Sequence, residues 1–277
     1  MRVYSLRNPC VAPERASSQP EGIPVKHRIL LSAALLIALV AAAPTFAMDK
    51  DELVAKSIEA QGGADRLQAV KSMTATGKAM AQGMEFPFNM RQVRPNLMRL
   101  DIDVMGMKMV QAYDGTQGWT INPMTGSQDA QPMGELENKS FKLQSDMDGL
   151  LLGADRKGYE VTFVGEADVE GTPAYQLKID TGEGIVIDMF IDQEYFLTIK
   201  QSATIDWDGK VVSQDTYMSD FQEVNGMVIP FSIETRMGAQ VVSQIVLDTV
   251  EHDTEIDPSV FAMPAAAPAA PATPEGQ

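Results

Sequence analysis

Apolar and polar residues alternate with a period of two through most of the chain between residues 73 and 250. In one run, Leu100 and Ile102 fall on one face of a predicted strand, and Asp101 and Asp103 fall on the other. This alternation is typical of an antiparallel sheet with one buried face and one solvated face. The pattern therefore predicts a mainly β fold of the α+β class.

Turn signals such as Asp208-Gly209 and Asn225-Gly226 separate the alternating runs, as expected for hairpins. The runs favour about 11–12 strands without any alternation of strand and helix. The predicted strands cover residues 73–82, 86–91, 98–104, 107–113, 119–121, 159–164, 175–179, 185–191, 196–207, 210–221, 227–233 and 241–250.

Helical spacing occurs in two places. Asp49 and Glu52 form a capping pair for a first helix, and Gly62-Gly63 ends it. A longer helix is predicted between Gly134 and Gly153, where apolar or small residues recur at helical intervals. Its inner face would carry Leu136, Ser140, Leu143, Met147 and Leu150. One such helix can cover only part of the sheet, so the pattern favours a curved sheet with an apolar cavity beneath a helical lid.

The N-terminal segment has the pattern of an export signal. A basic start at Lys26 and Arg28 precedes an apolar run over residues 29–43, which is shorter than a membrane span. Small residues follow, and we predict cleavage after Ala47. We expect the exported protein in the periplasm of a Gram-negative bacterium.

These features divide the chain into three parts. Residues 1–47 form the leader, and residues 1–24 lie so far upstream of the basic start that we hypothesise translation from Val25. Residues 48–263 form one β-rich domain, and the Ala- and Pro-rich residues 264–277 form a disordered tail. No Cys follows the apolar run, so we expect no lipid anchor on the mature chain.

Removal of the leader makes the chain more acidic. The whole sequence has 22 basic and 38 acidic residues, and residues 1–47 hold five basic and two acidic ones, leaving 17 − 36 = −19. Such a charge argues against nucleic acid and against anionic lipid surfaces as partners. The one Cys, Cys10, also leaves with the leader, so neither a disulfide nor a thiol nucleophile is expected.

Few residues in the mature chain could support catalysis. His252 is its one His, and we expect it in a surface acidic cluster rather than in a site. No Gly-x-Ser-x-Gly turn, phosphate-binding loop or dinucleotide fingerprint occurs. The carboxylate pairs Asp101 with Asp103 and Asp206 with Asp208 leave a hydrolase open as a lesser alternative. We expect no enzyme, no cofactor and no metal site.

Methionine is the most distinctive component, with 18 in the chain. Several cluster within or between the early predicted strands: Met80, Met84, Met90, Met98, Met105, Met107 and Met109. Because Met is unbranched and polarizable, a wall of Met conforms to acyl chains of variable shape. Taken alone, the cluster favours a loosely specified core over a ligand-binding wall.

The order of several short motifs resembles a known family. Residues 94–99 read Arg-Pro-Asn-Leu-Met-Arg, residues 114–119 read Asp-Gly-Thr-Gln-Gly-Trp, and Asn122-Pro123 follows. Residues 225–231 and 256–261 add Asn-Gly-Met-Val-Ile-Pro-Phe and Ile-Asp-Pro-Ser-Val-Phe. Together they resemble the LolA-like outer-membrane lipoprotein carriers and lipoprotein-sorting proteins, with Met98 in place of the usual aromatic residue.

The resemblance implies an unclosed antiparallel β-barrel, or half-barrel, with a helical lid and a concave apolar face for acyl chains. It also implies that Arg94 hydrogen-bonds to the lid and helps to hold the empty cavity shut. We therefore expect a ligand-binding wall under the lid. Its predicted members are Phe86, Phe88, Met90, Leu100, Ile102, Trp119, Leu143, Met147 and Leu150.

The function expected is that of a soluble periplasmic carrier for the acyl chains of lipoprotein or lipid. The cargo could be a lipoprotein, a free lipid or a lipid signal. Donor and acceptor proteins at the inner and outer membranes are implied by the family alone. The alternative is a regulatory module of the same fold that senses lipid or misplaced lipoprotein.

Overall fold

The structure is a computed structural model that describes residues 3–4, 48–126, 128–207 and 210–265. The predicted apolar signal segment, the cleavage site after Ala47 and residues 266–277 of the tail lie outside these ranges. The turn at Asp208-Gly209 also lies outside them, although the strands on either side of it pair from Trp207 to Lys210.

Two short helices open the described main segment. The first, α1 (Lys50–Ala60), begins where the Asp49 carboxylate accepts the backbone N–H of Glu52 at 2.8 Å, as the capping pair predicts. It ends before Gly62, whose φ of 122° few other residues adopt. The second, α2 (Ala64–Ala69), leads into the sheet.

One antiparallel sheet of 14 strands follows, and its order does not close into a barrel. The order runs from β7 at one edge through β6, β5, β4, β3, β2, β14, β13, β12, β11, β10 and β9 to β8 at the other edge. The strands are β2 (Ser72–Ala81), β3 (Met84–Val93), β4 (Leu97–Val104), β5 (Met107–Tyr113), β6 (Gly118–Ile121), β7 (Gln131–Pro132), β8 (Glu160–Val169), β9 (Thr172–Asp180), β10 (Ile185–Asp192), β11 (Thr198–Trp207), β12 (Lys210–Val224), β13 (Met227–Met237) and β14 (Gln240–His252). The predicted unclosed antiparallel architecture is confirmed. The two strands beyond the predicted twelve are β7 and β1 (Val3–Tyr4, paired with β12), and each has two residues.

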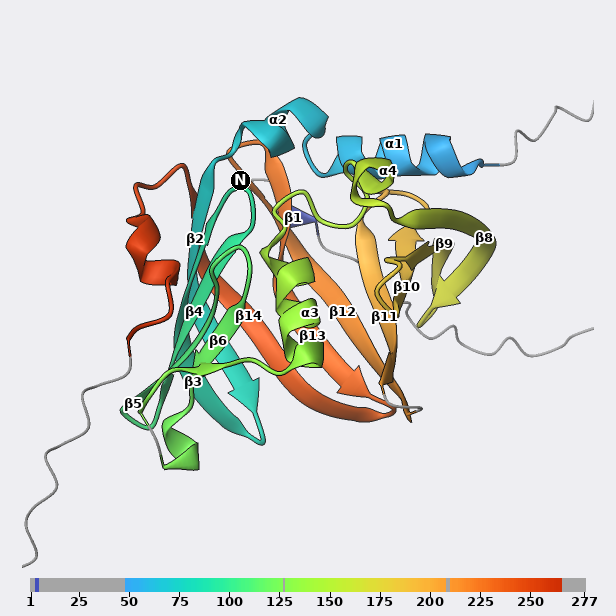
Figure 1. Cartoon of the computed structure of the whole chain (residues 1–277). Helices are drawn as coiled ribbons and strands as arrows, with labels where there is room; N and C mark the ends of the chain where they lie inside the picture. Colours follow the sequence, from blue (N-terminus) through green and yellow to red (C-terminus); the bar gives the residue numbers. More distant parts are fainter. Residues whose placement is uncertain (1–2, 5–47, 127, 208–209, 266–277) are drawn as a thin grey trace, which may run out of the picture. The chain divides into compact units, whose positions relative to one another are not determined.

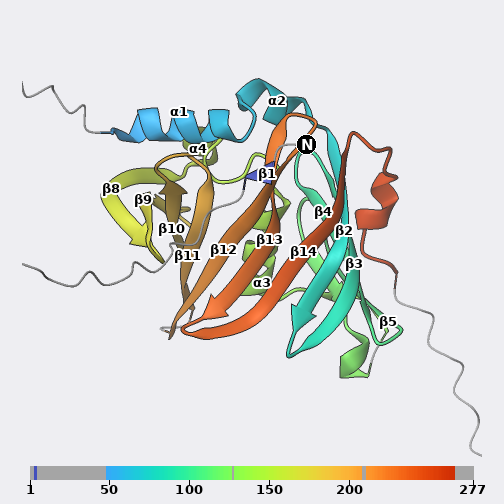
Figure 2. The same ribbon diagram turned by 180° about the vertical axis from the view of Figure 1, so that it is seen from behind.

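The sheet curves around the helix α3 (Glu135–Ser145), which lies on its concave face in both views (Figures 1 and 2). Along one edge of the sheet lie α1, α2 and the short α4 (Ala154–Lys157) (Figure 1). Two 3-10 helices, η1 (Pro123–Thr125) and η2 (Pro258–Phe261), complete the described elements. Across the described ranges, no helix combines the length and apolar character needed to cross a bilayer.

The predicted helix from Gly134 to Gly153 is too long, because α3 ends at Ser145. At that point the Asp146 carboxylate accepts the backbone N–H of Asp148 at 2.9 Å. Such a local side-chain turn competes with helical hydrogen bonding. Gly149 follows with a φ of 63°, so the chain forms a loop before α4. Met147 and Leu150 therefore belong to this loop and not to a helix.

Candidate functional site

An unbroken row of apolar side chains crosses the middle of the concave face. Residues that pair directly across antiparallel strands share one face of the sheet. The register pairs Phe86 with Ala79, Ala79 with Ile245, Ile245 with Ile233, and Ile233 with Met218. All five side chains are only partly buried. The centre of the sheet therefore presents an incompletely covered apolar surface.

The same face continues to both sides of this row. On one side, Phe88 pairs with Ile102 and Met90 pairs with Leu100. On the other side, Met189 of β10 pairs with Leu177 of β9 and with Gln201 of β11. Five predicted wall residues, Phe86, Phe88, Met90, Leu100 and Ile102, thus share the concave face as their alternation predicts. Their role in ligand binding stays a prediction.

The helix α3 covers this face mainly over β4, β5 and β6. Phe141 of α3 packs into a buried cluster with Met98, Tyr113 and Met133, against which Met90 also packs. Beside this cluster, the Gln92 side chain donates a hydrogen bond of 2.9 Å to the carbonyl of Gln144 at the end of α3. Leu143 is partly buried on the same helix. The helix is therefore fixed at one side of the concave face and leaves the central row open.

A cavity of about 220 Å³ lies on the concave face, beyond the part that α3 covers. Its walls come from the loop after α3, from α1 and α2, and from strands β10 to β13. The apolar lining residues include Ile58, Leu67, Leu150, Leu151, Leu152, Met189, Leu197, Met218, Phe221 and Val228. The polar residues Gln61, Asp148, Thr198 and Gln201 also reach it. Leu150 is the one predicted site residue that lines this cavity.

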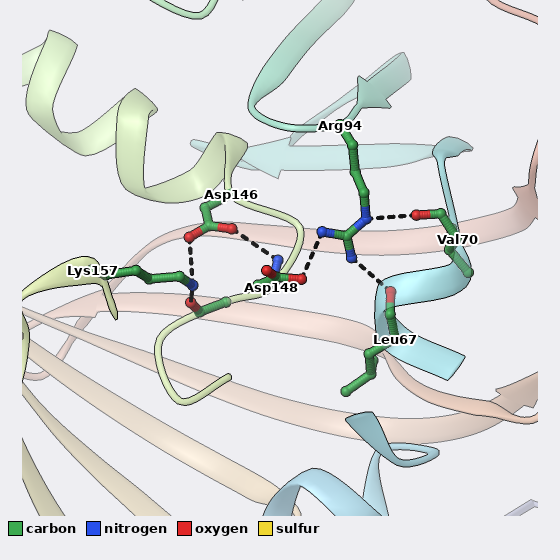
Figure 3. A network of polar contacts seen from close by, with 7 residues as sticks. Leu67, Val70, Arg94, Asp146, Asp148 and Lys157 are labelled. Atoms are coloured by element: carbon green, nitrogen blue, oxygen red, sulfur yellow. Dashed lines mark hydrogen bonds and ion pairs between the residues drawn. The ribbon is translucent and has the colours of Figure 1, made fainter. Parts of the chain in front are cut away.

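The loop that closes the cavity is shaped by its own charged residues. Asp146 forms an ion pair of 2.6 Å with Lys157 of α4, and Lys157 also donates a hydrogen bond of 2.5 Å to the carbonyl of Gly149. These contacts tie both ends of the loop together beside α4 (Figure 3). Leu151 and Leu152 are then buried, with 6% and 7% of their surface exposed. The loop thus packs its apolar side chains against the cavity over strands β10 to β12.

Arg94 connects this loop to the rest of the fold. Its Nε donates a hydrogen bond of 2.7 Å to the carbonyl of Val70, and one terminal nitrogen donates at 2.6 Å to the carbonyl of Leu67. The other terminal nitrogen contacts the Asp148 carboxylate at 2.6 Å (Figure 3). Both charged side chains are about one-fifth exposed, at 22% and 20%. Arg94 therefore contacts the loop after α3 through Asp148, and its role in holding an empty cavity shut stays a prediction.

Trp119 does not lie with the other predicted wall residues. It pairs with Ala112, and Ala112 pairs with Arg99, which places all three on the outer face of the sheet. There Trp119 is fully buried, and its Nε1 donates a hydrogen bond of 2.7 Å to the carbonyl of Phe261 in η2. Its assignment to the concave wall is wrong. The C-terminal segment buries the outer face here, so the apolar residues of β6, Trp119 and Ile121, face away from the concave side.

The carboxylate pair considered for catalysis is held in structural contacts. Arg99 binds Asp101 through two hydrogen bonds of 3.0 and 2.8 Å, and Asp103 accepts the backbone N–H of Gly106. These residues lie on the outer face, away from the cavity. Within the described ranges, no group of three or more His, Cys, Asp or Glu side chains is placed to bind a metal. The side chains of Asp206 and Asp208 lie outside the described part of the structure.

His252 differs from its prediction. The acidic residues around it, including Glu251 and Asp253, are exposed, but His252 itself is partly buried and pairs with Met73 on the concave face. Neither ring nitrogen has a hydrogen-bond partner among the described residues. Burial lowers the pKa of His252, and the nearby Asp253 carboxylate opposes this to a smaller extent. The side chain thus favours its neutral form.

The methionines divide into two groups. Met90 and Met98 join the cluster under α3, while Met84, Met105 and Met107 are exposed at 46%, 78% and 39%. The cavity itself holds two methionines, Met189 and Met218. None of the early methionines lines this cavity, and the wall of Met that the sequence predicts stays a prediction. The sequence reasoning missed the part of the wall on β10 to β12, although the strands themselves were predicted correctly.

Comparison with solved structures finds the same architecture in several bacterial proteins. A LolA superfamily protein from Nitrosomonas europaea aligns with a TM-score of 0.52 and 11% identity, over 78% of this chain and 98% of that chain. A protein domain from Vibrio parahaemolyticus, described as outer-membrane lipoprotein-sorting, aligns with a TM-score of 0.53 and 10% identity, over 76% and 94% of the two chains. A DUF1329 family protein from Desulfovibrio piger aligns with a TM-score of 0.54 and 12% identity, over 78% and 98%.

No protein-family model matches the sequence, and no curated protein matches it either. The structural likenesses, at 10–12% identity, define the fold. The chain has a LolA-like fold, as the resemblance of its motifs implies.

Proposed function

We propose that this protein is a periplasmic carrier, without enzymatic activity, that binds the acyl chains of a lipid or lipoprotein on its concave face. The observation that carries the proposal is the partly exposed apolar row from Phe86 to Met218 across five strands. An apolar surface of this kind usually marks a ligand or interaction site in a folded protein. Its extended form suits a long hydrocarbon better than a compact polar substrate.

The size of the cavity indicates how binding would proceed. A cavity of roughly 150 Å³ holds one benzene molecule in a protein interior, so about 220 Å³ takes only a short piece of an acyl chain. A complete chain would need more of the face, which requires the loop with Leu150, Leu151 and Leu152 to move aside. The contact between Arg94 and Asp148 would then break when ligand enters and form again when it leaves.

Hydrophobic burial would supply the binding energy. Each buried methylene contributes about 0.8 kcal/mol, and the ordering of chain and loop subtracts from the total. Transfer onward requires an acceptor with a stronger apolar site. The fold of the Vibrio and Nitrosomonas proteins supports a role in lipoprotein sorting, with donor and acceptor partners at the two membranes. The predicted export signal and the acidic mature chain fit a shuttle in the periplasm.

Mass spectrometry of organic extracts from the natively purified protein tests this proposal. We expect lipid or acylated lipoprotein to copurify, and the emptied protein to bind a dansyl-labelled fatty acid with saturation. Hydrolysis products should not accumulate from ester substrates of the same chain length. Absence of copurified lipid, together with no binding of the fatty acid or of an acylated lipoprotein, would remove the carrier function.

A further inference from the structure

The exposed apolar side chains of this protein gather where many strands of the sheet turn, at one end of the strands. Among the described residues, eleven large apolar side chains are strongly exposed, and eight of them lie at this end, with exposed fractions from 38% to 78%. We call these eight residues the hairpin edge. They are Met84, Met105, Met107, Met124, Val211, Val212, Met237 and Val241.

The strand pairing places these residues together although they are far apart in sequence. The turns β2–β3, β4–β5 and β13–β14 connect Ala81 to Met84, Val104 to Met107, and Met237 to Gln240. Because β14 pairs antiparallel with β2, its first residues lie beside the last residues of β2. The start of β12 and the helix η1 lie at the same end of the strands, opposite the end that α1 and α2 cover (Figures 1 and 2).

Turn chemistry does not explain these residues. The three described turns are Gln82-Gly83, Met105-Gly106 and Gly238-Ala239, and none carries a charge in a strongly acidic chain. Met105 is the most exposed of all, at 78%, and has a φ of 56°, where Asn or Gly is preferred. Neither packing nor turn preference explains Met105, and its position among seven other exposed apolar side chains indicates a contact outside the chain.

The hairpin edge adjoins the concave apolar face. Phe86 begins the apolar row two residues beyond Met84 on β3, so both point to the same face. The edge with α1, α2 and α4 is covered by helices, whereas this edge ends in bare hairpins (Figure 1). An apolar path therefore leads from the exposed hairpin tips along the sheet toward the cavity.

The arrangement favours a lipid surface over a protein partner. The apolar side chains project in ones and twos from separate turns, and on the other face of the β2–β3 hairpin Lys78 and Glu85 form an ion pair of 3.1 Å. A protein interface needs a packed and continuous apolar centre. Fluid lipid fills the spaces between separate tips, and flexible Met side chains adapt to it.

We propose that the hairpin edge docks transiently on a zwitterionic lipid surface, with the Met side chains entering the headgroup region. The acidic charge of the chain disfavours anionic lipid. This docking would open a route for acyl chains between the bilayer and the concave face, a consequence that rests on the carrier function proposed above.

Flotation of the purified protein with phosphatidylcholine and phosphatidylethanolamine vesicles tests the docking. The test variant combines Met105→Gln, Met124→Gln and Met237→Gln, and Met124→Gln alone serves as a milder second variant. The control combines Val164→Gln and Met263→Gln, which are exposed at 53% and 40% but lie away from this edge. We expect the triple variant to lose roughly tenfold or more of the vesicle-bound fraction, the single variant to lose less, and the control to match the unmodified protein.

Titration with the dansyl-labelled fatty acid in solution separates the two proposals, because it needs no membrane. Equal titrations of the triple variant and the unmodified protein, together with weaker flotation of the variant, support docking at this edge. The docking proposal is overturned if the unmodified protein does not float, if the triple variant floats equally, or if anionic vesicles bind more strongly. It is also overturned if the edge instead pairs two copies of the chain, seen as a dimer that only the triple variant dissociates.

Discussion

The guanidinium of Arg94 contacts the carboxylate of Asp148 at 2.6 Å and joins the end of β3 to the loop that closes the cavity. Asp148 itself lines the cavity, so this ion pair lies at the boundary between the empty space and the sheet. Arg94 also donates hydrogen bonds to two carbonyls at the end of α2, and these two contacts do not involve the loop.

Asp148→Asn should therefore loosen the loop while leaving the fold intact. The substitution removes the ion pair but keeps the size of the side chain, and the contacts of Arg94 with Leu67 and Val70 remain. We expect the fatty-acid probe to dissociate roughly tenfold faster, with the free energy of unfolding lowered by about 1 kcal/mol. Stopped-flow displacement of the probe measures the rate.

Asp155→Asn provides the matched control, because this exposed acid lies in the neighbouring α4 and does not contact Arg94. Its probe dissociation should equal that of the unmodified protein. Identical dissociation rates for Asp148→Asn and Asp155→Asn would show that the Arg94 contact does not control the loop.

Two consecutive residues of β14 test which face of the sheet binds ligand. Ile245 belongs to the central apolar row, and Val246 points to the opposite face, where it pairs with Lys78 and Ser232. Both are partly buried. Ile245→Gln should weaken binding of the fatty-acid probe by about tenfold, because it places an amide in the apolar path. Val246→Gln should leave the affinity unchanged, and equal effects of the two substitutions would contradict binding on the concave face.

Trp119→Phe should reduce stability without affecting ligand affinity. The substitution removes the buried hydrogen bond to Phe261 and leaves that carbonyl without its donor, which costs about 1–3 kcal/mol. Urea unfolding followed by circular dichroism gives the free energy of unfolding, since the substitution also removes a fluorophore. A clear loss of probe affinity at unchanged stability would return Trp119 to the binding wall.

His252 should make the folded state less stable in mild acid. Burial lowers its folded-state pKa below the ordinary 6.5, so the unfolded chain takes up a proton more readily as the pH falls. The contribution of His252 to the free energy of unfolding is constant above pH 6.5, and it is lost as the pH decreases toward the lowered pKa. His252→Gln should flatten this part of the stability profile.

Urea midpoints of both proteins between about pH 8 and 5 measure the effect of His252 in the range where His titrates. The difference between the two profiles isolates the imidazole, because the carboxylates contribute equally to both. Parallel profiles would mean that the burial of His252 has no energetic consequence in this range.

Local pattern was sufficient for much of the fold. The alternation in β3 and β4 correctly predicts that Phe88, Met90, Leu100 and Ile102 share one face, because side-chain direction within a strand follows a period of two. The cap at Asp49 and the glycines after α1 likewise depend on neighbouring residues only. The length of α3 was harder to predict, because the apolar spacing continues to Leu150 while the Asp146 side chain ends the helix at Ser145.

By itself the sequence determined the class of fold, the approximate positions of the main strands and the apolar faces of β3 and β4, since each depends on short-range spacing or on a local motif. Only the tertiary structure decided that Trp119 faces outward, that Asp148 is the partner of Arg94, and that Met189 and Met218 line one cavity. These relationships depend on the register between strands and on which segment covers each face. Alternation within one strand does not specify how its faces align with those of a strand a hundred residues away.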